Sequence, residues 1–242
     1  MGRGAGLRAV ARRARRVGQR WHVRSLGRMA PVDRSFGRAR GLPVDRWYGE
    51  RFLAAHQERI RGAVLEIGDD RYTRMFGDAS VTSSDVLHAV PGNPIATMVG
   101  DLSTGEGLPS EPSWDCILLY DVLPFIFDIP GAVRTAERLL RPGGTLLATA
   151  NGIAQLAHPD YEVWGEWWRP TDLALRRVFE DVFGTGRVTV GTHGNVLAAC
   201  ALLYGLAAEE VGDERLAHHD HDYQVTITVV ASKPLAGVRG EG

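Results

Sequence analysis

The chain has 242 residues, of which 44% are hydrophobic, so it can bury one sizeable core. It has neither an apolar run long enough to cross a bilayer nor an N-terminal apolar core of the secretory type. The net charge of −1 is the sum of two opposite contributions, because residues 1–40 carry a net charge of +11 and the remainder carries −12. This segregation predicts a basic arm attached to an acidic body.

The arm, residues 1–43, combines arginines with regularly spaced apolar residues. The apolar positions recur every three or four residues and are Leu7, Val10, Ala14, Val17 and Trp21. The pattern is typical of a basic amphipathic helix, which suits an anionic membrane surface, a protein partner or the phosphates of a nucleic acid. Two alternatives stay open, a disordered tail and a start of the protein at Met29.

The body, residues 44–234, alternates helix and strand patterns, and residues 235–242 are expected to be a flexible tail. Strand patterns cover residues 63–68, 80–87, 95–102, 114–126, 145–150, 187–193 and 223–233. Helix patterns cover residues 46–61, 131–141, 171–183 and 195–211. Thr171 or Asp172 caps the third of these helices.

Seven strands interleaved with helices predict a doubly wound, mostly parallel seven-stranded sheet of the Rossmann-like α/β class. Ligand sites are then expected at the carboxyl ends of the strands, and either of the last two strands can run antiparallel. Cys116 and Cys200 lie in apolar runs. We interpret them as buried small hydrophobic residues, and not as a disulfide or metal ligands, which indicates a cytoplasmic protein.

Four segments share residue types and spacing with a known family: VLEIGDD (64–70), SSDVL (83–87), VGDLS (99–103), and WDCILLYDVL (114–123) with ERLLRPGGTLLAT (137–149). From about residue 45 to residue 234 the chain resembles the class I S-adenosylmethionine-dependent methyltransferases, in a type 11-like form. The resemblance implies S-adenosyl-L-methionine as the cofactor.

The resemblance also implies a set of cofactor-binding residues, Glu66, Gly68, Asp70, Asp85, Val86, Asp101, Leu102 and Tyr120. Asp85 would accept hydrogen bonds from the ribose hydroxyls, since one carboxylate can orient both. It follows Glu66 by nineteen residues, near the spacing of ~20 for such an acid. Asp101 would accept from the adenine amino group, and Tyr120 would lie near the sulfonium or the adenine. The alternative for both acids is a turn or cap.

The chain departs from the family's E-x-G-x-G-x-G motif. Gly68 is present, but Asp70 and Tyr72 replace the next two glycines, and their side chains are expected to crowd the methionine end of the cofactor. Either the loop is rebuilt with charged partners for the methionine, or the cofactor site is lost and a non-catalytic scaffold docks partners through the arm. The charged residues available to a rebuilt loop are Asp69, Asp70, Arg71 and Arg74.

Substrate residues are expected after the fifth strand, where an aromatic segment carries Asn151, Trp167 and Arg169. Such a segment suits a sugar or a planar acceptor, and the alternative is a hydrophobic lid. His158 is the candidate general base for methylation of a hydroxyl, because imidazole titrates near neutral pH. His88 and Asp121 are weaker candidates.

Other substrates and sites are disfavoured. DVLPF (121–125) stands where base-modifying amine methyltransferases carry N/D-P-P-Y/F, and the acidic body suits phosphate backbones poorly. The run of residues 218–222 is interpreted as an exposed loop and not as a metal site.

The segments GDDRYTRMFG, WWRPT and NVLAACALLYGLAAEE are similar to a branch of these methyltransferases associated with bacterial polysaccharide and glycosyltransferase genes. That similarity implies O-methylation of a saccharide or another small molecule. It also fits a cytoplasmic location at the inner membrane surface.

Overall fold

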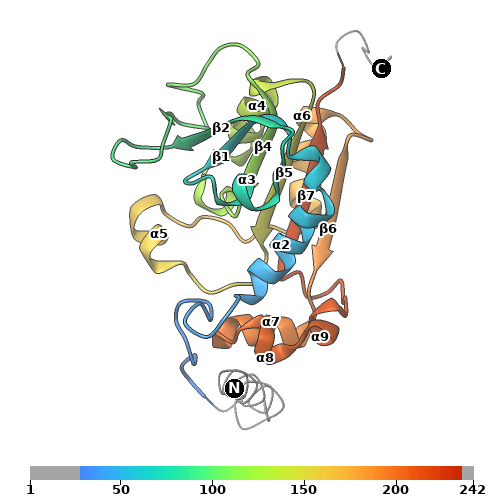
Figure 1. The fold of residues 1–242 in the computed structure, drawn as a ribbon. Coiled ribbons are helices and arrows are strands. Elements are labelled where there is room, and N and C mark those ends of the chain that lie inside the picture. The colour runs from blue at the N-terminus through green and yellow to red at the C-terminus, as the bar shows by residue number, and fades with distance from the viewer. Residues whose placement is uncertain (1–27, 236–242) are drawn as a thin grey trace, which may run out of the picture. The chain divides into compact units, whose positions relative to one another are not determined.

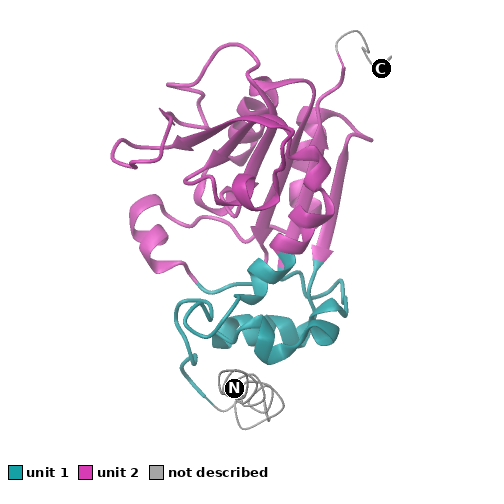
Figure 2. Cartoon of the chain, in the orientation of Figure 1, with its two compact units in different colours: residues 1–48, 153–155, 193–225 teal, residues 49–152, 156–192, 226–242 magenta. Residues whose placement is uncertain are grey.

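The computed structural model describes residues 28–235, so the arm helix expected over 7–21 and nearly all of the expected tail lie outside the described residues (Figure 1). The chain divides into two compact units (Figure 2). Unit 1 comprises residues 1–48, 153–155 and 193–225. Unit 2 comprises residues 49–152, 156–192 and 226–242. Among the described residues, no helix is long and apolar enough to cross a membrane.

Seven strands form one sheet in the order β3-β2-β1-β4-β5-β7-β6. They are β1 (Gly62–Ile67), β2 (Val81–His88), β3 (Met98–Val99), β4 (Trp114–Tyr120), β5 (Leu140–Asn151), β6 (Val188–His193) and β7 (Thr226–Ser232). The pairings from β3 through β5 are parallel, and β7 runs antiparallel to β5. The predicted doubly wound, mostly parallel seven-stranded sheet is confirmed.

The helices in the described part of the chain are α2 (Val44–Ala55), α3 (Arg71–Phe76), α4 (Ile129–Leu139), α5 (His158–Trp164), α6 (Asp172–Phe183), α7 (Val196–Tyr204), α8 (Ala208–Val211) and α9 (Asp213–Ala217). Two 3₁₀ turns are η3 (Gln57–Arg59) and η4 (Leu123–Phe125). The sequence did not predict α3 or α5. The helix expected over 195–211 is broken because Gly205 takes a left-handed conformation, φ +69°, and ends α7.

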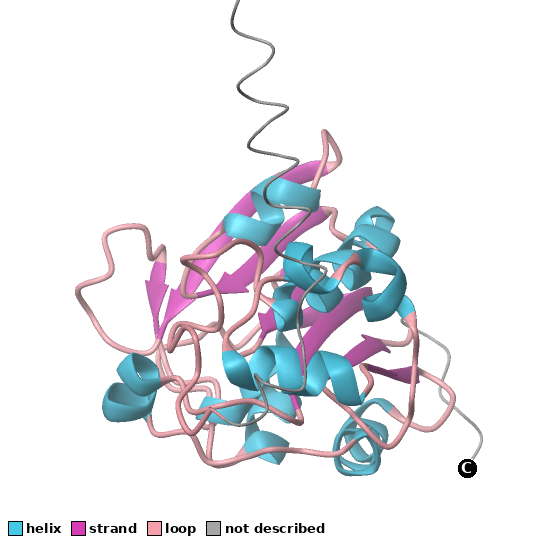
Figure 3. Cartoon of the chain, turned by 90° about the horizontal axis from the view of Figure 1, so that it is seen from below, coloured by secondary structure: helices cyan, strands magenta, loops and turns pink. Residues whose placement is uncertain are grey.

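Helices lie on both sides of the sheet (Figure 3), and the core of unit 2 is divided between the two faces. Successive residues of a strand point to opposite faces. In β4, Ile117 packs with residues of α4 and α6, whereas Cys116 and Leu118 pack with residues of α2 and α3. A strand covered on both faces needs apolar residues at every position, which explains the continuous apolar run of β4.

The core of unit 1 joins α7, α8 and α9 to the first turns of α2. Trp47 Nε1 donates to Asp213 Oδ1 at 3.0 Å, and the Tyr48 hydroxyl donates to the carbonyl of Leu216 at 2.8 Å. Burial raises the pKa of Tyr48 to about 12. Cys200 is only half-buried on α7, whereas Cys116 in unit 2 is fully buried as expected.

Candidate functional site

The candidate site lies at the carboxyl ends of β1 and β4, which are neighbours at the centre of the sheet (Figure 1). The chain builds outward from β1 through β2 and β3, and then returns to place β4 on the other side of β1. Such a reversal of strand order leaves a crevice outside the strand ends, where α/β folds bind ligands. All site residues described below belong to unit 2.

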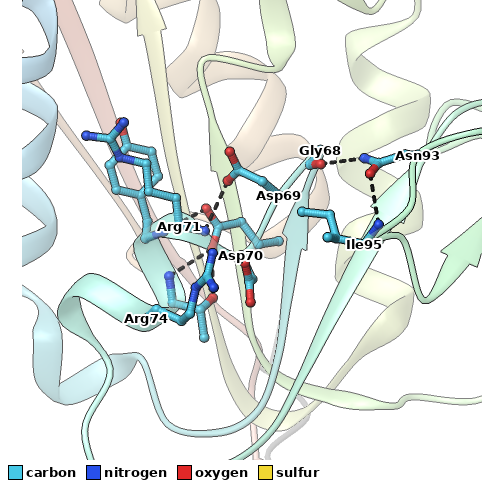
Figure 4. Close-up of polar contacts among 10 residues, drawn as sticks. Gly68, Asp69, Asp70, Arg71, Arg74, Asn93 and Ile95 are labelled. Atoms are coloured by element: carbon cyan, nitrogen blue, oxygen red, sulfur yellow. Dashed lines mark hydrogen bonds and ion pairs between the residues drawn. The ribbon is translucent and has the colours of Figure 1, made fainter.

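The loop after β1 presents bare backbone at this edge of the sheet. Gly68 has φ +87°, a conformation that favours glycine, and a Cβ placed there would meet no atom within 4 Å. Its carbonyl accepts a hydrogen bond from Asn93 Nδ2 at 2.6 Å (Figure 4). A ligand can therefore approach the backbone closely at Gly68.

Glu66, at the end of β1, holds the start of α3. Its buried carboxylate accepts hydrogen bonds from the amides of Tyr72 and Thr73, at 3.0 and 2.8 Å, and from Thr73 Oγ1 at 2.8 Å. Burial raises the pKa of Glu66, and these three donors oppose the shift. Both oxygens are thus engaged by α3.

Tyr72, which replaces the third motif glycine, turns into the core. Its side chain is 5% exposed and its ring stacks on Tyr120, with centroids 4.1 Å apart. Tyr120 in turn lies against the backbone of α2, where a Cβ at Gly49 would overlap its hydroxyl group. The sequence predicted that Tyr72 would crowd the methionine end of a cofactor, but α3 directs the ring inward.

The two acids of the same loop contact the first turn of α3 (Figure 4). Arg74 lies 2.7 Å from Asp70 Oδ1, and the amide of Arg71 donates to Asp69 Oδ1 at 3.0 Å. The Arg74 side chain is 71% exposed. Exposed ion pairs contribute about 0–1 kcal/mol, so a zwitterionic ligand can exchange them at little cost.

Asp85 lies inside β2, three residues before that strand ends. Its oxygens accept hydrogen bonds from Thr97 Oγ1 and Trp114 Nε1, each at 3.0 Å. Its register partner on β1 is the fully buried Leu65, and the next residue, Val86, is also buried. The half-buried Asp85 therefore links β2 to β4 and to the residue before β3, and its role toward ribose stays a prediction.

His88 is the residue that ends β2. Its Nδ1 lies 2.7 Å from the carbonyl of Val90, a contact in which Nδ1 donates, and in the neutral ring Nε2 is then an acceptor. The Trp164 ring and the imidazole pack in a T-shaped arrangement, with centroids 5.5 Å apart. The sequence had placed His88 among the weaker base candidates.

Beyond β3, Asp101 is exposed and accepts a hydrogen bond from the amide of Ser103 at 2.7 Å. The adjacent Leu102 is 6% exposed and belongs to the core of unit 2. Leu102 anchors this loop while the Asp101 carboxylate remains at the surface.

Asp121, directly after β4, has a left-handed backbone, φ +53°. Its amide donates to Thr149 Oγ1 at 2.9 Å, and that hydroxyl donates to Asp121 Oδ1 at 3.0 Å. A left-handed conformation costs a non-glycine residue about 1–2 kcal/mol and is concentrated at functional sites. The reciprocal bonds with Thr149 hold the carboxylate at the end of the central strand.

Glu166 links the residues before and after α5. Its side chain is 6% exposed, accepts from the amide of Ala157 at 2.8 Å and pairs with Arg169 at 2.6 Å. The predicted base His158 is exposed at the first turn of α5, and its ring faces Tyr161. The predicted substrate residue Arg169 thus serves in closing this segment.

An exposed aromatic cluster, which we call the aromatic shelf, comprises Phe127, Trp167 and Trp168. Trp167 is 54% exposed, and its ring lies 5.3 Å from that of Phe127. Its amide donates to the carbonyl of Pro124 in η4 at 2.8 Å, so the shelf is fixed to the segment that follows β4. Asn151, the third predicted substrate residue, ends β5 and accepts from Thr226 Oγ1 at 3.4 Å.

No protein-family model matches the sequence, and no curated protein matches it. Solved structures do match the fold. A SAM-dependent methyltransferase from Archaeoglobus fulgidus gives a TM-score of 0.51 at 9% identity, over 78% of this chain and 94% of that one. Phosphoethanolamine N-methyltransferase 2 from Haemonchus contortus, in complex with S-adenosyl-L-methionine, gives 0.50 at 14% identity, over 78% of this chain and 53% of that one.

A third similar structure is the [4+2]-cyclase SpnF, with a TM-score of 0.50 at 14% identity, over 86% of this chain and 88% of that one. A shared fold can host different chemistries, so the likeness concerns architecture. The chain has the fold of the class I S-adenosylmethionine-dependent methyltransferases.

Proposed function

We propose that the protein is a methyltransferase that binds S-adenosyl-L-methionine at the carboxyl edge of the unit 2 sheet. The observation that carries the proposal is the open backbone of Gly68 at the reversal of strand order. A close approach of ligand to backbone is what a glycine with positive φ permits at that point.

The residues at this edge fit the chemistry of the cofactor. Asp101 offers an exposed carboxylate for the adenine amino group, and His88 Nε2 offers an acceptor for a ribose hydroxyl. Asp70 and Arg74 can exchange their mutual ion pair for the ammonium and carboxylate of the methionine. We assign the ribose contact to His88 because it ends β2, whereas Asp85 lies within the strand and is held there by Thr97 and Trp114.

The bound cofactor supplies an electrophilic methyl group, and the protein must position an acceptor and remove its proton. Asp121 is the residue we assign to the proton, since Thr149 fixes its carboxylate at the end of β4. The aromatic shelf offers apolar faces for the acceptor beside the segment that follows β4. This arrangement suits O-methylation of a saccharide or another small hydroxyl compound.

Calorimetry with S-adenosylmethionine and S-adenosylhomocysteine tests the cofactor site. Gly68→Ala places a methyl group in the proposed ligand space, and Gly186→Ala is its matched control. Both glycines have nearly equal φ, +87° and +85°, and open surroundings, but Gly186 lies in the turn after α6. Both variants should lose similar stability, about 1–2 kcal/mol from backbone strain.

We expect Gly68→Ala to weaken cofactor binding at least tenfold, with Gly186→Ala equal to wild type. Equal affinity of both variants would place the cofactor elsewhere. No heat with either ligand on folded wild-type protein would refute the methyltransferase proposal and leave a non-catalytic scaffold of the same fold.

A further inference from the structure

Helix α7 of unit 1 leaves an apolar stripe uncovered. Val196 is 51% exposed and Leu203 is 43% exposed, and the half-buried Cys200 lies between them at helical spacing. We call these three residues the α7 stripe. The opposite side of the helix, which includes Ala198 and Leu202, is buried in the unit 1 core. No residue of α7 is charged, so the stripe offers a purely apolar contact.

The chain enters the described part of unit 1 at the end of this same helix. The carbonyl of Arg28 accepts a hydrogen bond from the Tyr204 hydroxyl at 3.3 Å. The amide of Val32 donates to the carbonyl of Tyr204 at 2.8 Å. Arg28 follows Trp21 by seven positions, and an extended chain of that length spans at most ~25 Å. Trp21 is therefore tethered within that distance of Arg28, at the end of α7.

Opposite net charges favour contact between the N-terminal residues and the segment of unit 1 that contains α7. Residues 1–27 contain eight arginines and no acidic residue. Residues 193–225, which include α7, α8 and α9, contain six acidic residues and one arginine, and Glu210 among them pairs with Arg40. The described part of unit 1 as a whole contains eight acidic residues and six arginines, a net charge of −2. Opposite net charges on tethered segments raise the local concentration of one at the other.

We propose that the α7 stripe is the docking surface for residues 7–21 of the same chain. The apolar positions in that segment recur with helical spacing and match a helix face that needs an apolar partner. The arginines between them then face solvent and the acidic segment of unit 1. This docking is independent of the proposed methyltransferase activity.

Thiol labelling of the full-length protein tests the docking, because Cys200 lies within the stripe. Cys116 provides an unreactive reference, since it is fully buried and burial raises its pKa. Val10→Asp with Val17→Asp places two charges on the apolar face of the segment. Ala9→Asp with Gln19→Asp adds the same two charges away from that face, at 100° per residue.

We expect maleimide to label Cys200 at least ten times faster in the Val10→Asp, Val17→Asp variant than in wild type, with the Ala9→Asp, Gln19→Asp control close to wild type. Equal rates in all three proteins would overturn the proposal. Protection of Cys200 only after addition of phosphatidylglycerol vesicles would assign the segment to a membrane, and would overturn it too. Protection of Cys200 that grows with protein concentration would show that a second copy of the protein covers the α7 stripe. That result would also overturn the proposal.

A cross-link provides the second measurement. In the Val17→Cys variant, mild oxidation should join residue 17 to Cys200 within one molecule, since a disulfide needs Cα atoms within about 7 Å. Gln19→Cys, on the far side of the segment, should not form that link. Equal or absent cross-linking in both variants would contradict docking through the predicted face.

Discussion

The rings of Tyr72 and Tyr120 stack 4.1 Å apart, at an interplanar angle of 28°, and connect the first turn of α3 to the end of β4. The stack places a bulky residue at the third motif glycine without exposing it at the sheet edge, because Tyr72 is 5% exposed. The replacement of glycine is therefore accommodated in the core.

Tyr72→Ala should destabilise the protein strongly. Removal of a buried aromatic side chain typically costs about 3–5 kcal/mol, from lost burial and the cavity that remains. Tyr161→Ala is the matched control, because Tyr161 is 45% exposed and should cost less than about 1 kcal/mol. Urea unfolding of both variants measures the difference. Equal losses would show that the stack contributes little.

Replacement of Asp85 should mainly lower the stability of the protein, whereas replacement of Asp101 should mainly weaken cofactor binding. Asp85→Ala leaves the buried Trp114 Nε1 without its acceptor, which should cost about 1–3 kcal/mol. Asp101→Ala removes an exposed turn contact and should change stability by less than about 1 kcal/mol.

Calorimetry should show the opposite ranking for cofactor affinity, with the larger loss in Asp101→Ala, since Asp101 is assigned to the adenine. Asp101→Ala should weaken S-adenosylmethionine binding, and Asp85→Ala should leave it near the wild-type value. Loss of binding in Asp85→Ala, with full stability, would return the ribose contact to Asp85, as the family resemblance implied.

The pKa of Glu66 predicts a pH dependence of stability. Burial raises this pKa above its ordinary value of about 4.5, so the folded state binds a proton more readily than the unfolded state. The stability advantage of wild type over Glu66→Gln should therefore shrink as pH rises from 4.5 to 7. Chemical unfolding across that range measures it. An advantage that grows with pH would show that the three hydrogen bonds outweigh burial.

Periodicity predicted the sheet because β4 is apolar over most of its length and β5 carries an apolar run at residues 146–148, which few other arrangements permit. The short helices α3 and α5 were missed for the opposite reason. Neither helix exceeds seven residues, too short for an apolar period, and α3 is positioned by Glu66, a contact that depends on the folded strand.

Site geometry was less predictable than the fold. The spacing from Glu66 to Asp85 matches the family, yet β2 continues to His88, so the acid lies within the strand. Strand ends are set by pairing with neighbours, here by Leu87 with Met98, and not by local sequence. His88 and Asp121 drew attention only as weaker base candidates, because their surroundings come from distant residues such as Thr149.

His193 should make the protein less stable in mild acid. Burial, together with the charge of His219, lowers the pKa of His193 below 6.5. The unfolded state then binds a proton that the folded state rejects, so stability falls as pH decreases below about 6.5. The slope from one such group is at most about 1.4 kcal/mol per pH unit.

Replacement of His193 by glutamine removes this proton uptake. His193→Gln should therefore lose less stability than wild type between pH 7.5 and pH 5.5, as measured by urea unfolding. His158→Gln is the control, because it makes the same substitution at an exposed histidine. If His193→Gln keeps the wild-type slope, the loss of stability in acid comes from other groups, and the stack of His193 on Tyr48 tolerates the charged imidazole.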